Sequence, residues 1–262
     1  KHFLHALQFN GSVILGAYDG ERMVGYSLGI LGAVPDFDLG RESLVATRLQ
    51  LYSHQLAVLP AYQSQGGGIQ LKVAQMETAE KLGLRRISWT FDPLVTRNAW
   101  VNIGRLGGIT NTYLINFYGG FEGEIPSDRL YLEWWIASPR VKARVATKRK
   151  PLGFEAVMEA GAVLANGASR NGDGWLTPAG ELADTDEGYM VLVEVPANHK
   201  EISAASYELG MAWRTHIRTL FQTLFREGFV ITDFVRRTDG DGQLRCYYLL
   251  THRDAADGFE MM

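Results

Sequence analysis

The 262-residue sequence predicts an α/β (α+β) fold built on a mixed, mostly antiparallel sheet, and three observations carry this prediction. Residues 12–31 have the pattern of two apolar strands joined by the polar turn Asp19-Gly20, which is typical of a β-hairpin. A strand that stops at Pro60 is followed by glycines and then by a helical pattern over 69–81. The second half repeats the order strand, long helix, strand over 189–251, which favours the same fold class.

The individual elements follow from apolar periodicity and from the positions of glycine and proline. Strands are predicted at 12–18, 23–31, 54–59, 86–91, 112–118, 129–137, 189–195, 230–236 and 244–251. Helices are predicted at 69–81, with Gly83 as the stop, at 96–106 and at 203–226. Apolar side chains recur on one face of the last helix, and we interpret that face as core.

Two domains are predicted, over residues 1–138 and 152–262, the second a smaller α+β domain whose element order echoes the first. A basic linker over 139–151 separates them and carries Arg140, Lys142, Arg144, Lys148, Arg149 and Lys150. We interpret these cations as part of a solvated linker or helix face. The alternative places them against an acidic partner or a phosphate group.

Composition excludes several classes of function. The chain is 46% hydrophobic and 21% charged, and it contains no apolar run of the roughly 20 residues that cross a bilayer. A net charge of −3 gives no reason to expect nucleic acid, and no Cys/His cluster has metal-ligand spacing. The single cysteine, Cys246, is expected to be a small buried hydrophobe. We expect a cytoplasmic protein with no membrane partner and, because the chain starts at Lys1, one that lacks its first residues.

The most informative segment is Leu56-Ala-Val-Leu-Pro-Ala-Tyr-Gln63-Ser-Gln-Gly66-Gly-Gly68-Ile-Gln-Leu-Lys72. A strand ends at a proline, and glycines then lead directly into a helix. This arrangement presents backbone N–H groups and the positive end of the helix dipole to an anion. Glycines allow the backbone to close around phosphate oxygens, because no side chain stands in the way.

Three phosphate-binding designs use a loop of this kind. A Walker loop requires lysine and then serine or threonine after the glycines, whereas Gly68 is followed by Ile69. A Rossmann fingerprint requires Gly-x-Gly-x-x-Gly directly after a strand, and here position 71 is leucine. The third design fits better: Gln63, Gly66 and Gly68 match motif A of the GNAT acyltransferase superfamily, Gln/Arg-x-x-Gly-x-Gly/Ala.

The chain therefore resembles the GNAT superfamily over roughly residues 10–137. A hairpin before the motif, and a strand and helix after it at 86–107, stand in the order of that family. The strand and helix that usually precede the hairpin are not seen. The resemblance implies a splayed sheet that binds an acyl-coenzyme A, with the basic linker near its 3′-phosphate as one interpretation, and a second half that is a degenerate relative.

The resemblance also implies cofactor-binding roles. The backbone of Val58 and its strand neighbours would hold the pantetheine arm like an added strand. Backbone N–H groups after Gln63 would bind the pyrophosphate, namely those of Gln65, Gly66, Gly67, Gly68 and Ile69. Asn98 would hydrogen-bond the pantetheine, and the alternative for this residue is a helix cap.

In this family an amine attacks the thioester directly, and a backbone N–H near Ala57 or Val58 would stabilise the oxyanion. The tyrosine that often protonates the leaving thiolate is absent from 96–106, where Ile103 stands near its place. Tyr113 and Tyr118 are the nearest replacements, and the alternatives are solvent protonation and a role in the core or on a sheet face.

His54, at the entry to the cofactor strand, is the candidate general base, and a surface or hydrogen-bonded polar residue is its alternative. Glu42 and Glu133 are further candidates for the base. Arg214 and Arg218 stand four apart on the long helix and would clamp a carboxylate of the acyl group or of the acceptor. A solvated helix edge is the alternative for this pair.

The sequence thus predicts an N-acyltransferase that moves an acetyl group, or a related group such as succinyl, from coenzyme A to an amine of a small molecule or amino acid. Acetyl-CoA or another acyl-CoA is the expected co-substrate, no metal is expected, and a homodimer is the expected assembly. The alternative is an inactive coenzyme-A-binding sensing module. A nucleotide-binding protein is a weaker alternative, because the loop lacks the expected lysine.

Overall fold

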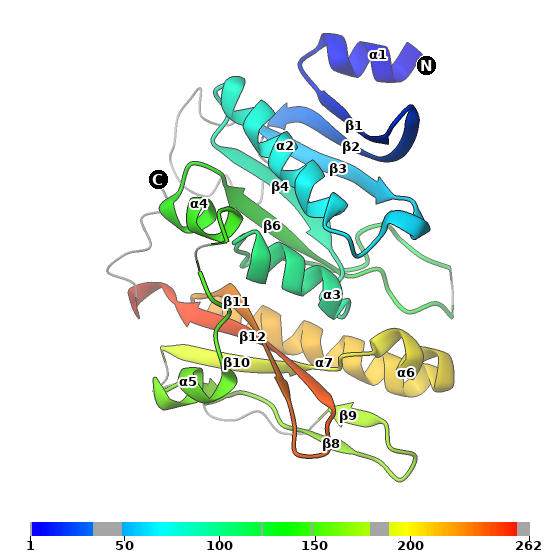
Figure 1. Ribbon diagram of the computed structural model, residues 1–262. Coiled ribbons are helices and arrows are strands. Elements are labelled where there is room, and N and C mark those ends of the chain that lie inside the picture. Colours follow the sequence, from blue (N-terminus) through cyan, green and yellow to red (C-terminus); the bar gives the residue numbers. More distant parts are fainter. Residues whose placement is uncertain (1, 34–48, 122, 148, 179–188, 256–262) are drawn as a thin grey trace. The chain divides into compact units, whose positions relative to one another are not determined.

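The computed structural model describes residues 2–33, 49–121, 123–147, 149–178 and 189–255. The chain forms two compact units. Unit 1 is built from Lys1–Trp89 and Glu133–Val145, and unit 2 from Thr90–Leu132 and Ala146–Met261. The mixed α/β class predicted from the sequence is confirmed (Figure 1).

The elements from the N-terminus to the end of unit 1 alternate strands with a few helices. They are α1 (His2–Phe9), β1 (Val13–Asp19), β2 (Arg22–Ala33), β3 (Leu49–Val58), η3 (Pro60–Tyr62), α2 (Gly67–Lys81), β4 (Arg86–Phe91), β6 (Arg129–Trp135) and α4 (Pro139–Val145). The sheet has the order β1-β2-β3-β4-β6-β5, and the division between the units falls within β4 and β6. Strand β2 is antiparallel to both β1 and β3, whereas β3 and β4 are parallel, so the sheet is mixed.

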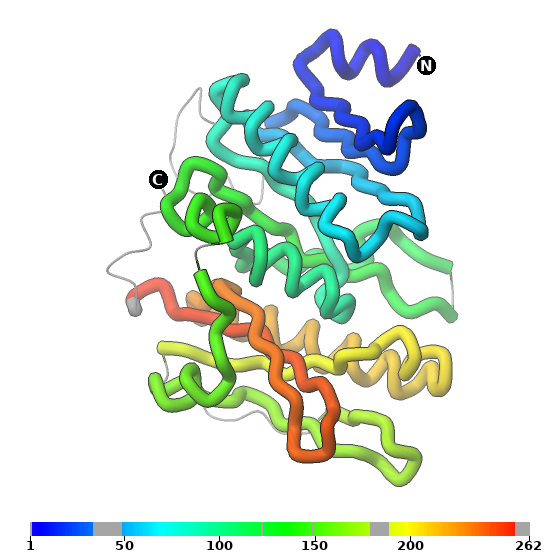
Figure 2. Tube along the Cα trace, in the orientation of Figure 1, coloured from blue at the N-terminus to red at the C-terminus, as the bar shows by residue number. Residues whose placement is uncertain are grey.

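Helix α2 packs against strands β1, β2 and β3, as the trace in Figure 2 shows. The approach is close at Gly29 of β2, where a Cβ atom would lie 2.7 Å from Leu51 Cδ2 and 2.8 Å from Gln75 Nε2. Glycine is therefore required there for packing. Gly83, with a φ of 76°, ends α2 where the sequence predicts the stop.

Unit 2 continues the chain with α3 (Thr96–Ala99), the π-helix η4 (Trp100–Arg105) and β5 (Tyr113–Leu114). After the crossover come α5 (Phe154–Glu159), β7 (Val163–Leu164), β8 (Ala168–Arg170), β9 (Leu176–Pro178), β10 (Met190–Val195), α6 (His199–Ala205), α7 (Tyr207–Arg226), β11 (Phe229–Thr238), β12 (Leu244–His252) and η5 (Arg253–Ala255). Its main sheet has the order β11-β12-β10-β7, and β8 pairs with β9 separately.

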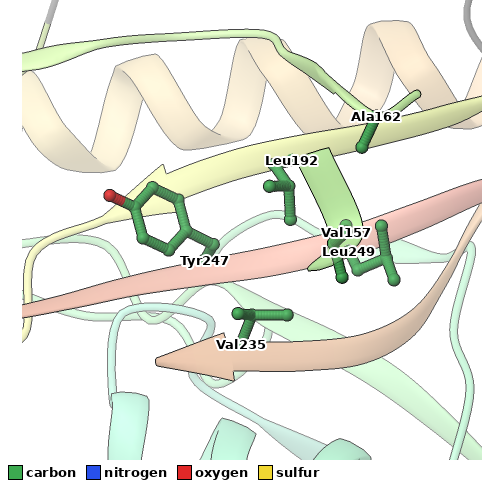
Figure 3. Packing of buried hydrophobic residues seen from close by; sticks show 6 residues of the cluster. All are labelled: Val157, Ala162, Leu192, Val235, Tyr247 and Leu249. Atoms are coloured by element: carbon green, nitrogen blue, oxygen red, sulfur yellow. The ribbon is translucent and has the colours of Figure 1, made fainter. Parts of the chain in front are cut away.

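Both faces of the sheet in unit 2 are buried. Trp213, Ile217 and Phe221 on α7 are fully buried, and the Phe221 ring meets the ring of Tyr248 edge-on at 5.2 Å. A second cluster lies near α5 and joins that helix to β10, β11 and β12 (Figure 3). It consists of Val157, Ala162, Leu192, Val235, Tyr247 and Leu249. Strands buried on both faces explain the nearly continuous apolar runs of this half.

Several predicted elements need correction. The helix predicted at 203–226 is two helices, because the chain is extended at Ser206, whose hydroxyl accepts a hydrogen bond from the Leu209 N–H at 3.1 Å and caps α7. The strand predicted at 112–118 is limited to Tyr113–Leu114, since Asn116 adopts a φ of 45° and the chain turns there. A helix does precede the hairpin, at His2–Phe9, although none was expected.

The predicted basic linker contains helix α4 and the change from unit 1 to unit 2 after Val145. Arg144 is buried, and Arg149 pairs with Asp233 at 3.3 Å, whereas Lys148 lies outside the described residues. Thr90–Leu132 belongs to unit 2, and the division into domains at 139–151 stays a prediction.

Cys246 is buried in β12, as predicted, and burial raises the pKa of its thiol to about 11.

Candidate functional site

The parallel pairing of β3 and β4 is short. It comprises Leu51↔Ile87 and Tyr52↔Ser88, and in the described strands no residue of β3 after Tyr52 pairs with β4. Strand β3 continues to Val58 and stays paired with β2 on its other side. Because a strand rises about 3.3 Å per residue, this leaves an unpaired edge of roughly 17 Å on β3. The sheet is therefore splayed here, as the resemblance implies.

A β-bulge lies at the start of the unpaired edge. Gly29 of β2 pairs with Ser53 and Leu28 pairs with Gln55, so His54 is the extra residue of β3. The His54 side chain is exposed, and its ring lies 6.1 Å from that of Tyr52. Bulges redirect side chains and backbone groups next to functional sites. His54, the predicted general base, thus lies beside the point where the strands separate.

The glycine loop lies at the other end of this edge. Two side-chain hydrogen bonds hold the loop in shape. Gln63 Nε2 donates to Val58 O at 2.9 Å, and Gln65 Nε2 donates to Ala61 O at 3.0 Å. Gly66 adopts a φ of 86°, a left-handed conformation that favours glycine, and it is the N-cap of α2 without a side-chain cap.

The loop presents a set of unused donors. In the part of the chain that the structure describes, the N–H groups of Gln65, Gly66, Gly67 and Gly68 donate no hydrogen bond to another backbone group or side chain. The Ile69 N–H differs, because it donates to Gly66 O at 3.0 Å. A cluster of unused N–H groups at a helix N-terminus is suited to an anion such as a pyrophosphate.

Packing within the chain does not explain the glycines at 67 and 68. A Cβ atom on Gly67 would meet nothing nearer than Val58 Cγ1 at 4.0 Å, and one on Gly68 nothing nearer than Leu56 Cδ2 at 3.6 Å. Both contacts are of ordinary van der Waals length. The space beside these glycines is consistent with a ligand that approaches the backbone closely, so the residues fit a diphosphate group.

A buried lysine lies beneath the splay. The Lys72 amine, one turn after Gly68 on α2, donates to Ser53 Oγ at 2.7 Å and lies 3.4 Å from the centroid of the Trp89 ring. Lys72 and Ser53 are only 7% and 6% exposed. No carboxylate of the described residues pairs with Lys72, and burial lowers the pKa of its amine well below the ordinary value.

Three other predicted residues lie in unit 2. Asn98 is an exposed residue within α3, and the N-cap of that helix is Val95, so the capping alternative for Asn98 is not what the structure has. The Tyr113 hydroxyl donates to Asp128 Oδ2 at 2.8 Å, and burial, together with this carboxylate, raises the pKa of Tyr113. Tyr118 is 59% exposed and lies against Arg129, whose Cζ is 5.0 Å from the ring.

The two predicted carboxylate-binding arginines already hold carboxylates. Arg214 donates from both terminal nitrogens to Asp92 at 2.9 and 2.8 Å. Arg218 donates to Asp128 at 2.8 and 3.0 Å. These charged pairs connect α7 to the segment Thr90–Leu132 inside unit 2. A role in substrate binding stays a prediction, and it would require a ligand to replace Asp92 or Asp128.

Glu133 and Glu42 are the further candidates for the general base. Glu133 forms a salt bridge with Arg86 in unit 1, and Glu42 lies outside the described residues. Within the described ranges, no group of three or more acidic, histidine or cysteine side chains could hold a metal ion. Among the described helices, none has the length and apolarity to cross a membrane.

Sequence reasoning missed the Lys72–Ser53 contact and both aspartate partners of the arginines. A signal for Lys72 was present. This lysine directly follows Leu71 and lies on the same helix face as residues 75, 76 and 79, which are buried. A lysine on the face that a helix buries against a sheet is unusual and calls for a reason. Asp92 and Asp128 had no such signal, because they lie far from α7 in sequence.

The chain is similar to solved structures over about half of its length. The ribosomal-protein-S18-alanine N-acetyltransferase of Escherichia coli is 17% identical, with a TM-score of 0.40, over 52% of this chain and 77% of that one. A GNAT family acetyltransferase from Elizabethkingia anophelis with acetyl-CoA bound is 13% identical, with a TM-score of 0.38, over 52% and 82%. A GNAT family acetyltransferase from Streptococcus pneumoniae is 16% identical, with a TM-score of 0.39, over 50% and 71%. No family model and no curated protein matches the sequence.

Proposed function

We propose that the chain is a coenzyme-A-dependent acyltransferase that moves an acyl group from the thioester to an amine. The observation that carries this proposal is the unpaired edge of β3, which runs from the bulge at His54 to the glycine loop before α2. An acyl-coenzyme A has a matching order of groups: a diphosphate, an arm with two amides, and a thioester at the far end.

The unpaired edge supports binding of the arm. Backbone N–H and C=O groups of an open strand edge form hydrogen bonds with any extended chain of amides, as in β-strand addition. The diphosphate would lie at the N–H groups of Gln65, Gly66, Gly67 and Gly68, and Gln63 and Val58 would hold the loop in shape. The Ile69 N–H contributes less, because it already has an acceptor in Gly66. Asn98 stays a candidate for a hydrogen bond to the arm.

This placement brings the thioester to the bulge. Backbone N–H groups of β3 that do not pair with β4 would then donate to the thioester oxygen as negative charge develops on it. An amine that attacks there needs a proton acceptor, and His54 is exposed beside the site. The bound and oriented reactants gain rate mainly from proximity, without a covalent intermediate on the enzyme.

The acyl group and the acceptor are finer points of the proposal. We expect acetyl or succinyl as the acyl group and a small amine or amino acid as the acceptor, in a cytoplasmic protein that forms a homodimer. Tyr118 and Tyr113 stay the candidates for protonating the leaving thiolate; the Tyr118 side chain is exposed, and the Tyr113 hydroxyl is held by Asp128.

The alternative function is a sensing module that binds coenzyme A without turnover. One observation favours it: the helical segment after β4 carries Ile103, fully buried, and no tyrosine that could protonate the thiolate. Both functions require the same cofactor site. They differ in whether free thiol is released when acyl-CoA and an amine are present together.

The proposal is tested by calorimetric titration with acetyl-CoA, succinyl-CoA, coenzyme A and ATP, followed by thiol-release assays over a panel of amines. We expect micromolar affinity for the coenzyme A compounds and none for ATP. Binding with thiol release identifies an acyltransferase, and binding without it identifies the sensing module. Absence of any coenzyme A binding would contradict both functions.

A pair of variants connects the affinity to the loop. Gly68→Ala adds a methyl group beside the proposed diphosphate without a clash in the chain, so the affinity for coenzyme A should fall at least tenfold while the stability of the fold is kept or rises by about 0.5–1 kcal/mol. Gly153→Ala is the matched control, because Gly153 likewise lies at the start of a helix, as the N-cap of α5, and also has open space around its Cβ position. That control should bind coenzyme A like the wild type.

A further inference from the structure

Lys72 is a buried ionisable residue of unit 1 that the proposed function has not yet used. Its Nζ is held between Ser53 Oγ, at 2.7 Å, and the face of the Trp89 ring, at 3.4 Å from the centroid. An amine on the buried face of a helix costs stability unless it is compensated, and a methionine or leucine would fill the same space. The contact with Ser53 gives a reason for a lysine at this position.

Ser53 lies where the two parallel strands separate. It follows Tyr52, the last residue of β3 that pairs with β4, and it precedes the bulge residue His54. In the proposed function this is the end of the unpaired edge that receives the acyl group. The hydroxyl of Ser53 therefore connects the buried amine to the place where the acceptor nitrogen would attack.

The surroundings of Lys72 favour a neutral amine at rest. The groups recorded in contact with its Nζ are a hydroxyl and an indole, neither of which ionises near neutral pH. The ionisable side chains on the strands next to α2 are Tyr18, Asp19, Arg22, Tyr26, Tyr52, His54 and Arg86, and on α2 itself Glu77, Glu80 and Lys81. None of them shifts the pKa of Lys72, which burial alone lowers. The ring of Trp89 would nevertheless stabilise a positive charge once one forms.

We propose that Lys72 and Ser53 form the proton-accepting pair of the acyl transfer, with Ser53 in contact with the acceptor amine and Lys72 behind it as the base. This inference rests on the proposed function and assigns the base of that same site to Lys72 instead of His54. Neutral lysine has two N–H donors and one lone pair, and a serine hydroxyl rotates freely, so the bond between them can run in either direction.

The step balances without a further reactant. One N–H bond of the acceptor ammonium breaks and its proton goes to Ser53 Oγ, while the proton of Ser53 goes to the lone pair of Lys72 Nζ. The neutral acceptor nitrogen then forms the C–N bond to the thioester carbon. The C–S bond breaks as the oxyanion collapses, and the second proton of the nitrogen goes to the thiolate. Lys72 carries one positive charge until it returns its proton to water.

The first measurement requires no turnover. The pKa of Lys72 is read from the pH titration of its ε-methylene signal by NMR, assigned with Lys72→Met, and we expect a midpoint well below the ordinary lysine value of about 10.4. A Lys72 midpoint at or above that ordinary value would overturn the proposal.

The second measurement is the pH profile of kcat/KM for thiol release, with coenzyme A affinity measured on each variant. In the wild type we expect a decline at low pH with the midpoint that NMR gives for Lys72. Lys72→Met should lower kcat/KM at least 100-fold and remove that midpoint, with coenzyme A affinity within threefold of the wild type. Lys72→Arg, which cannot give up its proton, should fail equally, Ser53→Ala should lose at least tenfold, and Lys81→Met should behave as the wild type.

The outcomes separate this proposal from the function on which it rests. If the wild type binds no coenzyme A, both are overturned. If it binds and turns over, and Lys72→Met or Ser53→Ala keeps the wild-type rate and profile, the proton-accepting pair alone is overturned. If His54→Ala lowers the rate and removes the low-pH midpoint, while Lys72→Met behaves as the wild type, the base is His54 instead.

Discussion

Lys72 in unit 1 and Arg214 in unit 2 both lie on the buried face of a helix, at 7% and 3% exposure, yet only Arg214 meets a carboxylate. Arg214 makes a two-pronged pair with Asp92, whereas Lys72 contacts a hydroxyl and an aromatic ring. Although burial opposes its charge, the hydrogen bonds to Asp92 keep the pKa of Arg214 above its ordinary value. Burial acts on Lys72 without such compensation.

The difference follows from the chemistry of the two groups. A guanidinium does not lose its proton in a protein, so a buried arginine requires a counter-charge. A lysine amine can be buried neutral instead, and it then has a lone pair with which to accept a proton. We therefore regard Arg214 and Asp92 as part of the stability of unit 2, and Lys72 as part of the chemistry of unit 1.

Asp92→Asn should have the largest effect on stability. The amide still accepts the Leu94 N–H, but the buried Arg214 loses its counter-charge, so the free energy of unfolding should fall by about 3 kcal/mol in urea titrations. Asp241→Asn, on an exposed turn, is the control and should stay within about 0.5 kcal/mol of the wild type. A loss below 1 kcal/mol for Asp92→Asn would show that Arg214 does not depend on this pair.

Lys72→Met should raise the free energy of unfolding, whereas Asp92→Asn should lower it. Because burial lowers the pKa of Lys72 in the folded chain, the unfolded chain binds this proton more tightly. The wild type therefore gains stability as pH rises toward the unfolded pKa of about 10.4, by at most about 1.4 kcal/mol per pH unit. The variant lacks this gain and should be more stable by about 1–2 kcal/mol at pH 7. The difference between the two proteins should shrink toward pH 10.4, in urea titrations at several pH values. A variant that is less stable at pH 7 would indicate a charged Lys72.

The smallest effect expected is the coupling between Ser53 and Lys72. A hydrogen bond between neutral groups contributes about 1 kcal/mol, and one to a charged group about 1.5–3 kcal/mol. A double-mutant cycle with Ser53→Ala and Lys72→Met should therefore give about 1 kcal/mol, and the corresponding cycle with Asp92→Asn and Arg214→Met should give more. Equal coupling energies would remove the distinction between Lys72 and Arg214.

Much of the fold was predictable because it depends on local signals. The strand at Arg86–Phe91 is a short apolar run, and the end of α2 at Gly83 depends on a conformation that glycine favours. The break at Ser206 was missed because apolar periodicity continues through it, while the serine acts as a cap. The strand at 112–118 failed for a related reason, since its aromatic residues suggest β structure but Asn116 turns the chain.

The site was predictable only in part. The glycine loop is contiguous in sequence, so its motif could be read directly. The structure adds that the N–H groups from Gln65 to Gly68 have no acceptor in the described chain. The partners of Lys72, Arg214 and Arg218 come from distant segments and depend on strand register and on how helices pack. Such contacts leave no local pattern, so the two arginines were interpreted as substrate ligands or solvent-exposed residues.

Hydrogen exchange on binding of coenzyme A tests the central claim that the unpaired edge of β3 is the cofactor site. Amide exchange in the peptide that contains Ser53 to Val58 is followed by mass spectrometry, with and without saturating coenzyme A. We expect slower exchange in this peptide and in the glycine loop, and no change in β10, which is buried in unit 2. Coenzyme A that binds without protecting β3, or that protects only unit 2, would contradict the claim.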